Sequence, residues 1–254
     1  MKGLVPRFEK SADEMTREWD QLAEERNQQI VSGEDLSFRH VVVPSALRLL
    51  ASADTSTVLD VGCGTGHFTL QLSRMAKKVI AIEPSAASIR VARDVCRDAS
   101  NVQFVHGYLE NSVGQLAEAR PTGAAAVMTL MSVANLSAFA SALASALPGG
   151  AKFVAIVTHP WFWPQYWGYQ SAAWFGYYRE TFIEAPFTIS RKRTKIITTH
   201  IHRPLEQYVA TFFEAGFRLE LALEPLPDQE VEALYPKPWS FPRFLGFRWE
   251  RARA

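Results

Sequence analysis

Four short apolar runs, separated by segments of helical spacing, constrain the fold of this chain more than any other feature. The runs cover residues 58–61, 79–82, 102–105 and 153–157. They are rich in β-branched residues and apolar on both faces, which is typical of strands buried in a parallel sheet. Between them, Phe68, Leu72 and Met75 recur at helical spacing, and Ser85 can cap a second helix. This alternation predicts right-handed crossovers and a doubly wound α/β sheet, with ligands at the carboxyl ends of its strands.

The rest of the chain divides into flanks and an insertion around this core. The length of 254 residues suits one large domain, and the sequence contains no internal repeat and no low-complexity linker. We expect the following division: an N-terminal helical lid at 1–50, the core at 51–158 and 204–254, and a cap insertion forming the substrate pocket at 159–203. Trp19 belongs to a set of apolar positions near helical spacing, so the lid helix either crosses the mouth of the fold or packs on its side.

Strand and helix patterns also occur in the second half of the chain. Residues 187–190 and 195–201 predict a β-hairpin, and we interpret its basic turn of Arg191, Lys192 and Arg193 as a solvated tip rather than a site for an anion. Pro204 is placed to open a helix that ends near Gly216. Residues 219–223 and 244–249 predict the last strands.

Composition excludes several classes of partner. The 27 basic and 26 acidic residues leave a formal charge of +1, which creates no broad field for nucleic acid or an anionic membrane. We therefore predict a small-molecule substrate, no nucleic-acid partner and no membrane partner. Cys63 and Cys96 are the only cysteines and indicate neither a disulfide framework nor a metal site. No apolar stretch approaches the roughly 20 residues of a membrane span, and the first residues lack a signal peptide's apolar core, so we expect a cytoplasmic protein.

A glycine-rich turn follows the first predicted strand. Residues 60–68 read Asp-Val-Gly-Cys-Gly-Thr-Gly-His-Phe and lead into a predicted helix. Glycines are needed where a side chain would hold a ligand away from backbone amides or could not adopt the required dihedrals. Asp60 ends the first strand and Glu83 ends the second, where a carboxylate can accept both hydroxyls of a ribose. Two acids and a glycine turn together predict a nucleoside-binding site.

These residues resemble the class I S-adenosylmethionine-dependent methyltransferases, whose first motif is an acid followed by x-G-x-G-x-G and whose second strand ends in a ribose-binding acid. A nicotinamide-binding loop differs, because its third small residue comes one position later, where this chain has His67. The likeness extends over about residues 19–249: residues 101–111 resemble the third strand and adenine loop, and residues 147–150 resemble the turn before the fifth strand. The segments 33–50, 202–205 and 215–217 are similar to stretches of small-molecule members.

The resemblance implies a mostly parallel, Rossmann-like seven-stranded sheet, S-adenosylmethionine as cofactor and a defined set of cofactor contacts. The implied cofactor-binding residues are Asp60, Gly62, Cys63, Gly64, Gly66, Glu83, Pro84, Gly107, Tyr108, Leu109, Thr129, Leu130, Trp19 and Arg39. Arg39 would pair with the carboxylate of the methyl donor. The chain departs from the family in two places: Tyr108 rather than an aspartate follows Gly107, and the fourth strand ends near Thr129 and Ser132, which are not strong bases.

Histidines are the candidate bases for an oxygen or carbon acceptor, because the ordinary histidine pKa lies near working pH. His159 follows the predicted fifth strand directly, so we expect it to face the acceptor. His200 and His202 alternate along a predicted strand and share one face. Each of the three can instead serve only as a structural hydrogen-bonding group.

Residues 159–178 are dense in aromatic side chains and show no clean strand or helix period. We interpret them as a lid that excludes water and offers flat walls to an apolar acceptor. The predicted substrate-binding residues are Trp161, Trp163, Tyr166, Trp167 and Tyr169. Such a cluster can equally form a packed core or an interface between subunits, so a homodimer stays an open alternative.

The sequence thus predicts a methyltransferase acting on a small, largely apolar organic molecule, in secondary-metabolite biosynthesis, with O-methylation favoured over N- or C-methylation. Two other functions stay open. One is a nicotinamide-dependent oxidoreductase, and the other is a non-catalytic S-adenosylmethionine-binding module that presents its aromatic surface to a protein partner.

Overall fold

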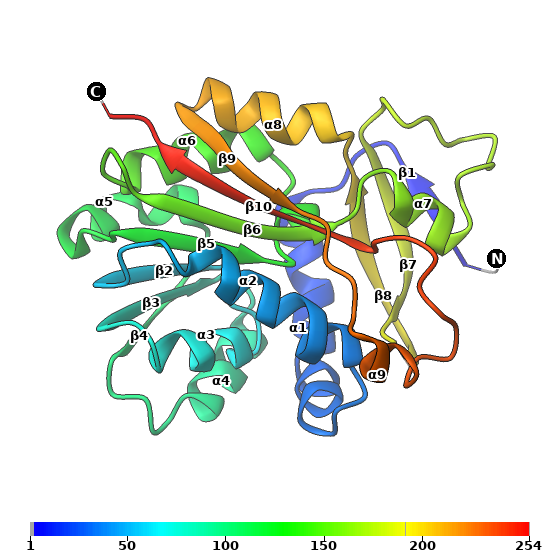
Figure 1. Ribbon diagram of the computed structural model, residues 1–254, viewed down its shortest axis with the longest axis horizontal. Coiled ribbons are helices and arrows are strands. Elements are labelled where there is room, and N and C mark those ends of the chain that lie inside the picture. The colour runs from blue at the N-terminus through cyan, green and yellow to red at the C-terminus, as the bar shows by residue number, and fades with distance from the viewer. Residues whose placement is uncertain (1–2, 191, 254) are drawn as a thin grey trace.

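Figure 1 shows the computed structural model, which describes residues 3–190 and 192–253. Its centre is a seven-stranded sheet with the strand order β4-β3-β2-β5-β6-β10-β9. The strands are β2 (Thr57–Val61), β3 (Lys78–Glu83), β4 (Val102–His106), β5 (Gly123–Val127), β6 (Lys152–Thr158), β9 (Phe217–Leu223) and β10 (Phe244–Arg251). All pairs from β4 to β6 are parallel, whereas β10 is antiparallel to β6 and β9. The predicted doubly wound, mostly parallel sheet is confirmed.

Helices cover both faces of this sheet (Figure 1). They are α2 (Val43–Leu50), α3 (His67–Ser73), α4 (Ala86–Val95), α5 (Leu109–Ala119), α6 (Leu136–Ala146) and α8 (Leu205–Glu214). Because side chains alternate along a strand, Leu59 of β2 packs in the cluster that contains α5, α6 and α8, while Val58 packs in the cluster that contains α2 and α3. Apolar residues on both faces of the strands are therefore buried under two helical layers.

A second, three-stranded antiparallel sheet lies beside the central one, with the order β1-β7-β8. Its strands are β1 (Val5–Arg7), β7 (Thr181–Thr188) and β8 (Arg193–His202). The predicted hairpin is confirmed, but its first strand begins at Thr181 rather than at residue 187. The polar Glu184 and the proline Pro186 interrupt the apolar pattern there, which hid the beginning of the strand. Arg193 belongs to β8, and Arg191 lies outside the described residues.

The N-terminal helix α1 (Ala12–Val31) lies between the carboxyl-end edge of the central sheet and the small sheet (Figure 1). Ser11 caps it in a reciprocal arrangement with Glu14, which satisfies two free backbone N–H groups of the first turn. The helix packs against α4 and β8. A π-helical turn (Phe38–Val42) then leads into α2. The N-terminal helix therefore crosses the mouth of the fold.

Short elements complete the edge at which α1 lies. A 3-10 turn (Leu130–Ser132) follows β5, the helix α7 (Phe162–Trp167) lies within the aromatic stretch, and α9 (Gln229–Glu232) precedes β10. Gly168, at a φ of 75°, ends α7. In the described part of the chain, no helix combines the length and hydrophobicity needed to cross a membrane.

Candidate functional site

The glycine turn after β2 is held by backbone hydrogen bonds to the neighbouring strand. The N–H groups of Gly62 and Cys63 donate to the carbonyl of Ile82, at 2.8 and 3.0 Å. Gly62, Gly64 and Gly66 all have positive φ, between 53° and 80°, which side chains rarely tolerate. A β-carbon at Gly66 would lie 2.8 Å from the Cα of Ala92, whereas one at Gly64 would meet no protein atom within 4 Å. Gly66 thus lets α3 approach α4, and Gly64 faces open space.

Two buried carboxylates stand at the strand ends beside this turn. Oε2 of Glu83 accepts the N–H of Gly64 at 2.9 Å, and Oε1 accepts the N–H of Ser85 at 2.9 Å. Oδ2 of Asp60 accepts the hydroxyl of Thr69 at 2.6 Å. Burial raises the pKa of Asp60 to about 7 and the pKa of Glu83 to about 7. No basic side chain forms an ion pair with either acid within the described residues, so both are poised to accept hydrogen bonds from a ligand.

A cavity of about 370 Å³, which we call the glycine-loop cavity, opens in front of these groups. Eleven of the fourteen predicted cofactor residues line it: Trp19, Asp60, Gly62, Cys63, Gly64, Glu83, Pro84, Gly107, Tyr108, Leu109 and Thr129. The phenol of Tyr108 donates to Asp13 at 2.8 Å and bonds with Thr16 at 2.9 Å, so α1 closes one side of the cavity. Open space at Gly64 and free lone pairs on Glu83 fit a nucleoside with two ribose hydroxyls.

The other three predicted cofactor residues lie elsewhere. Gly66 packs against Ala92, and Leu130 is fully buried in the core. Arg39 is exposed on the π-helical turn and lines neither cavity of the site, because the turn directs it outward. The arginine that lines the glycine-loop cavity is Arg26 on α1, which sequence analysis missed. Its spacing of seven from Trp19, two helical turns along one face, was the available signal.

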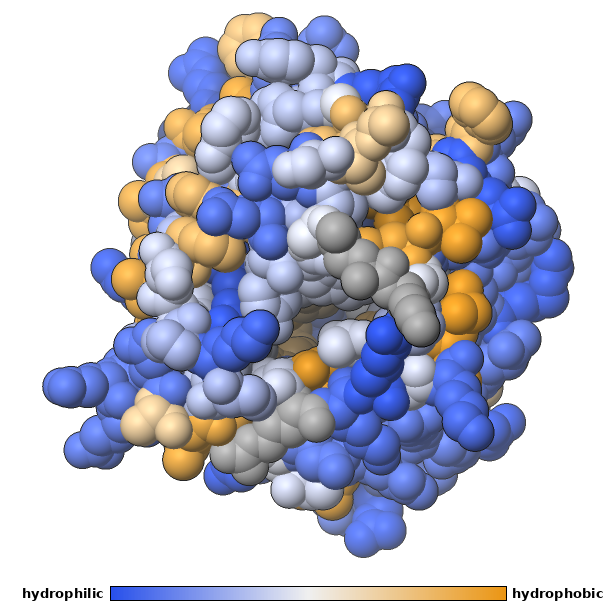
Figure 2. All heavy atoms as spheres, turned by 90° about the vertical axis from the view of Figure 1, so that its right-hand side faces the viewer, coloured by the Kyte–Doolittle hydropathy of each residue, from blue (hydrophilic) through white to orange (hydrophobic). Residues whose placement is uncertain are grey.

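A second cavity, of about 740 Å³, adjoins the first, and we call it the aromatic cavity. Five residues line both cavities: Trp19, Arg26, Phe38, Met128 and Ser132. The other walls come from the aromatic stretch, from β7 and β8 with their connecting turn, and from the segment 236–244. The face that carries the small sheet is hollowed near its centre (Figure 2). A ligand in one cavity would therefore lie next to a ligand in the other.

Three of the five predicted substrate residues, Trp163, Tyr166 and Trp167, line the aromatic cavity. The other two do not. Trp161 is exposed and packs its ring edge against Tyr177, and Tyr169 is buried against Trp174 and Phe175. The three that line the cavity belong to α7, whereas Trp161 lies just before this helix and Tyr169 just after it.

Of the three candidate histidines, only His200 lines a cavity. Its ring lies 6.1 Å from that of Trp163 and 6.2 Å from that of Trp167, between centroids. Burial, with the nearby His202 and Arg203, lowers the pKa of His200 to about 3. This imidazole is therefore neutral and can accept a hydrogen bond from a ligand in the aromatic cavity.

The expectation that His159 faces the acceptor does not match its position. Its Nε2 lies 2.8 Å from Oε1 of Glu224, and its Nδ1 accepts the N–H of Trp161 at 3.2 Å. His202 is bonded through Nε2 to the carbonyl of Tyr177 at 2.9 Å. Burial lowers the pKa of both imidazoles. At the end of β6, Thr158 lines the aromatic cavity and His159 does not.

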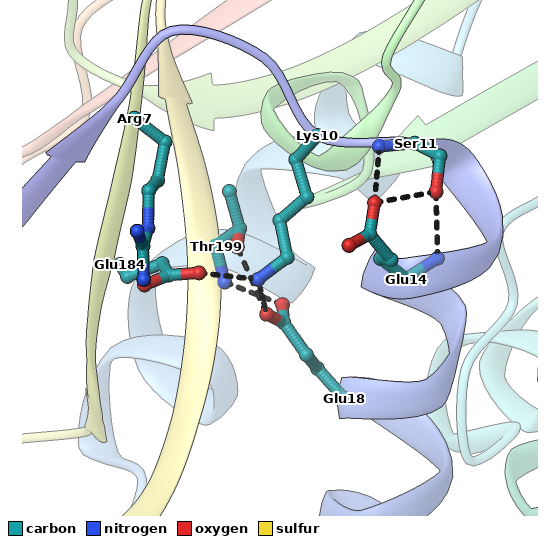
Figure 3. A network of polar contacts seen from close by, with 7 residues as sticks. All are labelled: Arg7, Lys10, Ser11, Glu14, Glu18, Glu184 and Thr199. Atoms are coloured by element: carbon teal, nitrogen blue, oxygen red, sulfur yellow. Dashed lines mark hydrogen bonds and ion pairs between the residues drawn. The ribbon is translucent and has the colours of Figure 1, made fainter.

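A buried polar network holds α1 over the two cavities (Figure 3). The carboxylate of Glu18 accepts the N–H of Thr199 at 2.7 Å and its hydroxyl at 3.0 Å. Lys10 forms ion pairs with Glu18 and, at 2.7 Å, with Glu184 of β7. Because Thr199 is flanked by cavity-lining residues of β8, this network links α1, with Trp19 and Arg26, to the wall that carries His200.

A buried arginine, Arg203, positions the turn shared by the two cavities. Its guanidinium donates to the carbonyls of Leu130 at 2.8 Å and Val133 at 2.6 Å, and it forms an ion pair with Glu180 at 2.5 Å. These bonds fix the 3-10 turn after β5, which ends at the cavity-lining Ser132.

Comparison with known proteins agrees with this architecture. Residues 58–150 match the family described as a methyltransferase domain. Over these residues the chain is similar to methyltransferase domains. The matched stretch contains the glycine turn, both buried acids and the residues after β4 and β5.

Solved structures with the same fold cover most of the chain. One is described as a putative S-adenosylmethionine-dependent methyltransferase from Listeria monocytogenes, with a TM-score of 0.60, 19% identity, and coverage of 82% of this chain and 97% of that chain. Another is the complex of DhpI with SAH, with a TM-score of 0.61, 18% identity, and coverage of 96% and 98%. At these identities the likeness shows the fold.

Curated relatives match only short parts of the chain. A 23S rRNA (uracil(1939)-C(5))-methyltransferase from Paraburkholderia xenovorans is 53% identical over 49 residues, which is 19% of this chain and 10% of that protein. An rRNA adenine N-6-methyltransferase from Bacteroides fragilis is 35% identical over 74 residues, 29% of this chain and 28% of that protein. The chain therefore aligns with 28% or less of the length of these relatives.

Proposed function

We propose that this protein transfers a methyl group from S-adenosylmethionine to a small organic acceptor held in the aromatic cavity. The observation that carries the proposal is the shared wall of the two cavities, formed by Trp19, Arg26, Phe38, Met128 and Ser132. Methyl transfer is an in-line displacement, so acceptor and methyl must be held roughly 3 to 3.5 Å apart and aligned. Two adjoining cavities with a common wall provide for that alignment.

The residues of the glycine-loop cavity act by binding and orienting the donor. Glu83 accepts hydrogen bonds from the ribose hydroxyls, and the glycines let the nucleoside approach the backbone. When bound, S-adenosylmethionine supplies an electrophilic methyl group on a positively charged sulfur. Trp19 and Phe38, which line both cavities, exclude water at the junction.

The size and walls of the aromatic cavity support a small-molecule acceptor. A volume of about 740 Å³ lies within the range of about 300 to 1,000 Å³ of small-ligand sites. Flat rings of Trp163, Tyr166 and Trp167 suit an aromatic or otherwise apolar body, which supports a role in secondary-metabolite biosynthesis. The balanced charge of the chain argues against an RNA acceptor, which is what the curated relatives named above modify.

His200 is the residue we propose to orient an acceptor hydroxyl, which favours O-methylation. Its neutral ring accepts a hydrogen bond from that hydroxyl inside the aromatic cavity. With a pKa of about 3 it is a weak base, because a general base works best with a pKa near the operating pH. Its role is therefore to direct the oxygen lone pair towards the methyl group. The C–O bond forms as the methyl–sulfur bond breaks, the hydroxyl proton is released to solvent water, and positioning supplies most of the rate.

Ligand binding followed by methyl transfer tests the proposal. Calorimetry on the purified protein should show binding of S-adenosylhomocysteine, the demethylated cofactor, and no binding of nicotinamide dinucleotides. Transfer of label from methyl-labelled S-adenosylmethionine to a panel of hydroxylated aromatic compounds should then be detected. Binding of dinucleotide instead would establish the oxidoreductase alternative, and cofactor binding without transfer to any acceptor would favour the non-catalytic module.

A further inference from the structure

Arg243 is a buried cation in the wall of the aromatic cavity. It directly precedes β10, and its carbonyl accepts the N–H of His159 at 2.9 Å, which fixes its backbone at the carboxyl-end edge of the sheet. The residue is 6% exposed, and it lines the aromatic cavity but not the glycine-loop cavity. Its side chain therefore meets the acceptor rather than the cofactor.

The guanidinium of Arg243 is surrounded by rings rather than by acids. Its Cζ lies 4.2 Å from the ring centroid of Tyr166, 4.2 Å from that of Trp239 and 5.3 Å from that of Tyr235. Its hydrogen bonds are long: Nη1 donates to the hydroxyl of Tyr166 at 3.3 Å and Nη2 donates to the carbonyl of Lys237 at 3.4 Å. Both close rings lie within cation–π distance of the guanidinium, and its N–H edge makes only these two hydrogen bonds within the described residues, so part of that edge is free for a further partner.

No carboxylate within the described residues forms an ion pair with Arg243, although a buried cation needs one. Burial lowers its pKa, and the surrounding Tyr166, Tyr235 and Glu232 oppose that shift. Glu232 acts only from a distance, because its carboxylate accepts the N–H of Trp239 at 2.6 Å. Only two of the five N–H donors of the guanidinium, those to Tyr166 and Lys237, therefore have an acceptor among the described residues.

Other buried arginines of the site are matched. Arg203 has Glu180 and backbone carbonyls, and Arg26 forms an ion pair with Asp35 at 2.7 Å. Cations also exceed acids in the lining of the aromatic cavity: Arg26 is paired with Asp35, whereas neither Lys237 nor Arg243 forms an ion pair within the described residues. In a chain with a net charge of +1, this excess of cations is local to the cavity.

We propose that the acceptor carries an oxyanion, a carboxylate or a phosphate, on its apolar body, and that Arg243 binds this group through its free edge. The inference rests on the proposed function and names the substrate class of the same site. A planar guanidinium with N–H groups to spare suits an oxyanion, because two parallel N–H···O bonds fix both position and orientation. The anion anchors one end of the acceptor while His200 directs the other towards the cofactor.

Matched probes bound to the protein saturated with S-adenosylhomocysteine test this inference. Benzoate and phenyl phosphate supply the two kinds of oxyanion, and benzamide is the neutral counterpart of benzoate. Titration calorimetry should show at least one of the anions binding about tenfold to a hundredfold more tightly than benzamide. The stronger of the two anions identifies which oxyanion the site prefers.

Three variants test whether Arg243 is responsible for the preference for anions over benzamide. Arg243→Gln should abolish it, Arg243→Lys should retain part of it, and Arg218→Gln, which removes an exposed arginine of β9, should leave it unchanged. Near-ultraviolet circular dichroism checks that the aromatic surroundings of residue 243 persist, and the comparison of probes on the unaltered protein stands even if a variant does not fold.

Equal affinity for anions and benzamide in the unaltered protein, including no detectable binding of either, overturns the inference. So does an unchanged preference in a folded Arg243→Gln variant. Failure of the proposed function gives a different result, because S-adenosylhomocysteine itself would then not bind, or label would reach no acceptor.

Discussion

The two cavities that meet under α1 are built in different ways. The glycine-loop cavity is formed largely by backbone: three glycines with positive φ, N–H groups and two acids at consecutive strand ends. The aromatic cavity is formed by side chains from segments far apart in the chain, from Gly3 to Phe244. The glycine-loop cavity depends on a few positions where no other residue fits. In the aromatic cavity, by contrast, substitution of the lining side chains can change which ligand binds.

Substitution of a glycine should give the largest effect. Gly64→Val is expected to abolish detectable binding of S-adenosylhomocysteine, because the new side chain would fill the open space in front of the turn. The variant should still fold, at a cost of about 1 to 3 kcal/mol for a φ of 53°. Calorimetry and urea unfolding measure the two quantities.

Gly66→Val is the matched control for that variant. Its β-carbon would press on the backbone of Ala92, so this change should lower the free energy of unfolding by more than Gly64→Val does. A Gly64→Val protein that binds with the parent's affinity would remove the basis for calling the turn a cofactor site.

Removal of the buried acid should give the next largest effect. Glu83→Ala should weaken binding of S-adenosylhomocysteine about tenfold to a hundredfold, because hydrogen bonds to a charged acceptor are lost. Since Glu83 also bonds to Gly64 and Ser85, the glutamine variant at this position should lose less than the alanine variant. Calorimetry on both variants would contradict the assignment if neither lost affinity.

A smaller effect, on the aromatic cavity alone, is expected for its histidine. His200→Ala should lower kcat for an oxygen acceptor about tenfold, the value of one hydrogen bond, rather than the hundredfold or more of full proton transfer. Cofactor affinity should not change, because His200 does not line the glycine-loop cavity.

His159→Gln tests the histidine that the sequence placed next to the acceptor against His200, which lines the cavity. Because His159 bonds to Glu224 outside both cavities, its replacement should leave kcat within about threefold of the parent. Steady-state kinetics that showed a large loss for His159→Gln and none for His200→Ala would reverse this assignment.

The pH dependence of cofactor affinity should give a modest effect. The pKa of Glu83 is raised to about 7, and ribose hydroxyls bond best to its ionised form. Affinity for S-adenosylhomocysteine should therefore rise with pH, about fivefold between pH 6 and pH 8. Calorimetry across this range checks the trend, and Glu83→Gln should flatten it.

Stability without cofactor should change with pH in the opposite direction. Because the folded pKa of Glu83 lies above its ordinary value of 4.5, the folded protein binds more protons than the unfolded chain. Its contribution to the free energy of unfolding is complete below about pH 4.5 and is lost as pH rises towards 7. Urea unfolding of the cofactor-free protein should show this decline.

Local sequence patterns predicted much of the fold. Periodicity found four of the parallel strands, the helix caps at Ser85 and Pro204, and the glycine turn, because each depends on neighbours along the chain. The remaining parallel strand, β5, was identified only through the family resemblance. Its Gly-Ala-Ala-Ala-Val sequence has side chains too small to give a clear apolar pattern, although every residue before Val127 is buried.

The sequence by itself determined where the glycine turn and its two acids lie, since a positive φ demands glycine and a strand end places an acid whatever the rest of the chain does. Only the tertiary structure decided which of several similar residues form the second cavity. The surroundings of each side chain distinguish His200 from His159 and Arg26 from Arg39. They also distinguish Arg243, which has no ion pair within the described residues, from Arg203, which is paired with Glu180. Much of those surroundings comes from other elements of the fold, such as Tyr166 beside Arg243 and Leu130 beside Arg203, so no local pattern encodes them.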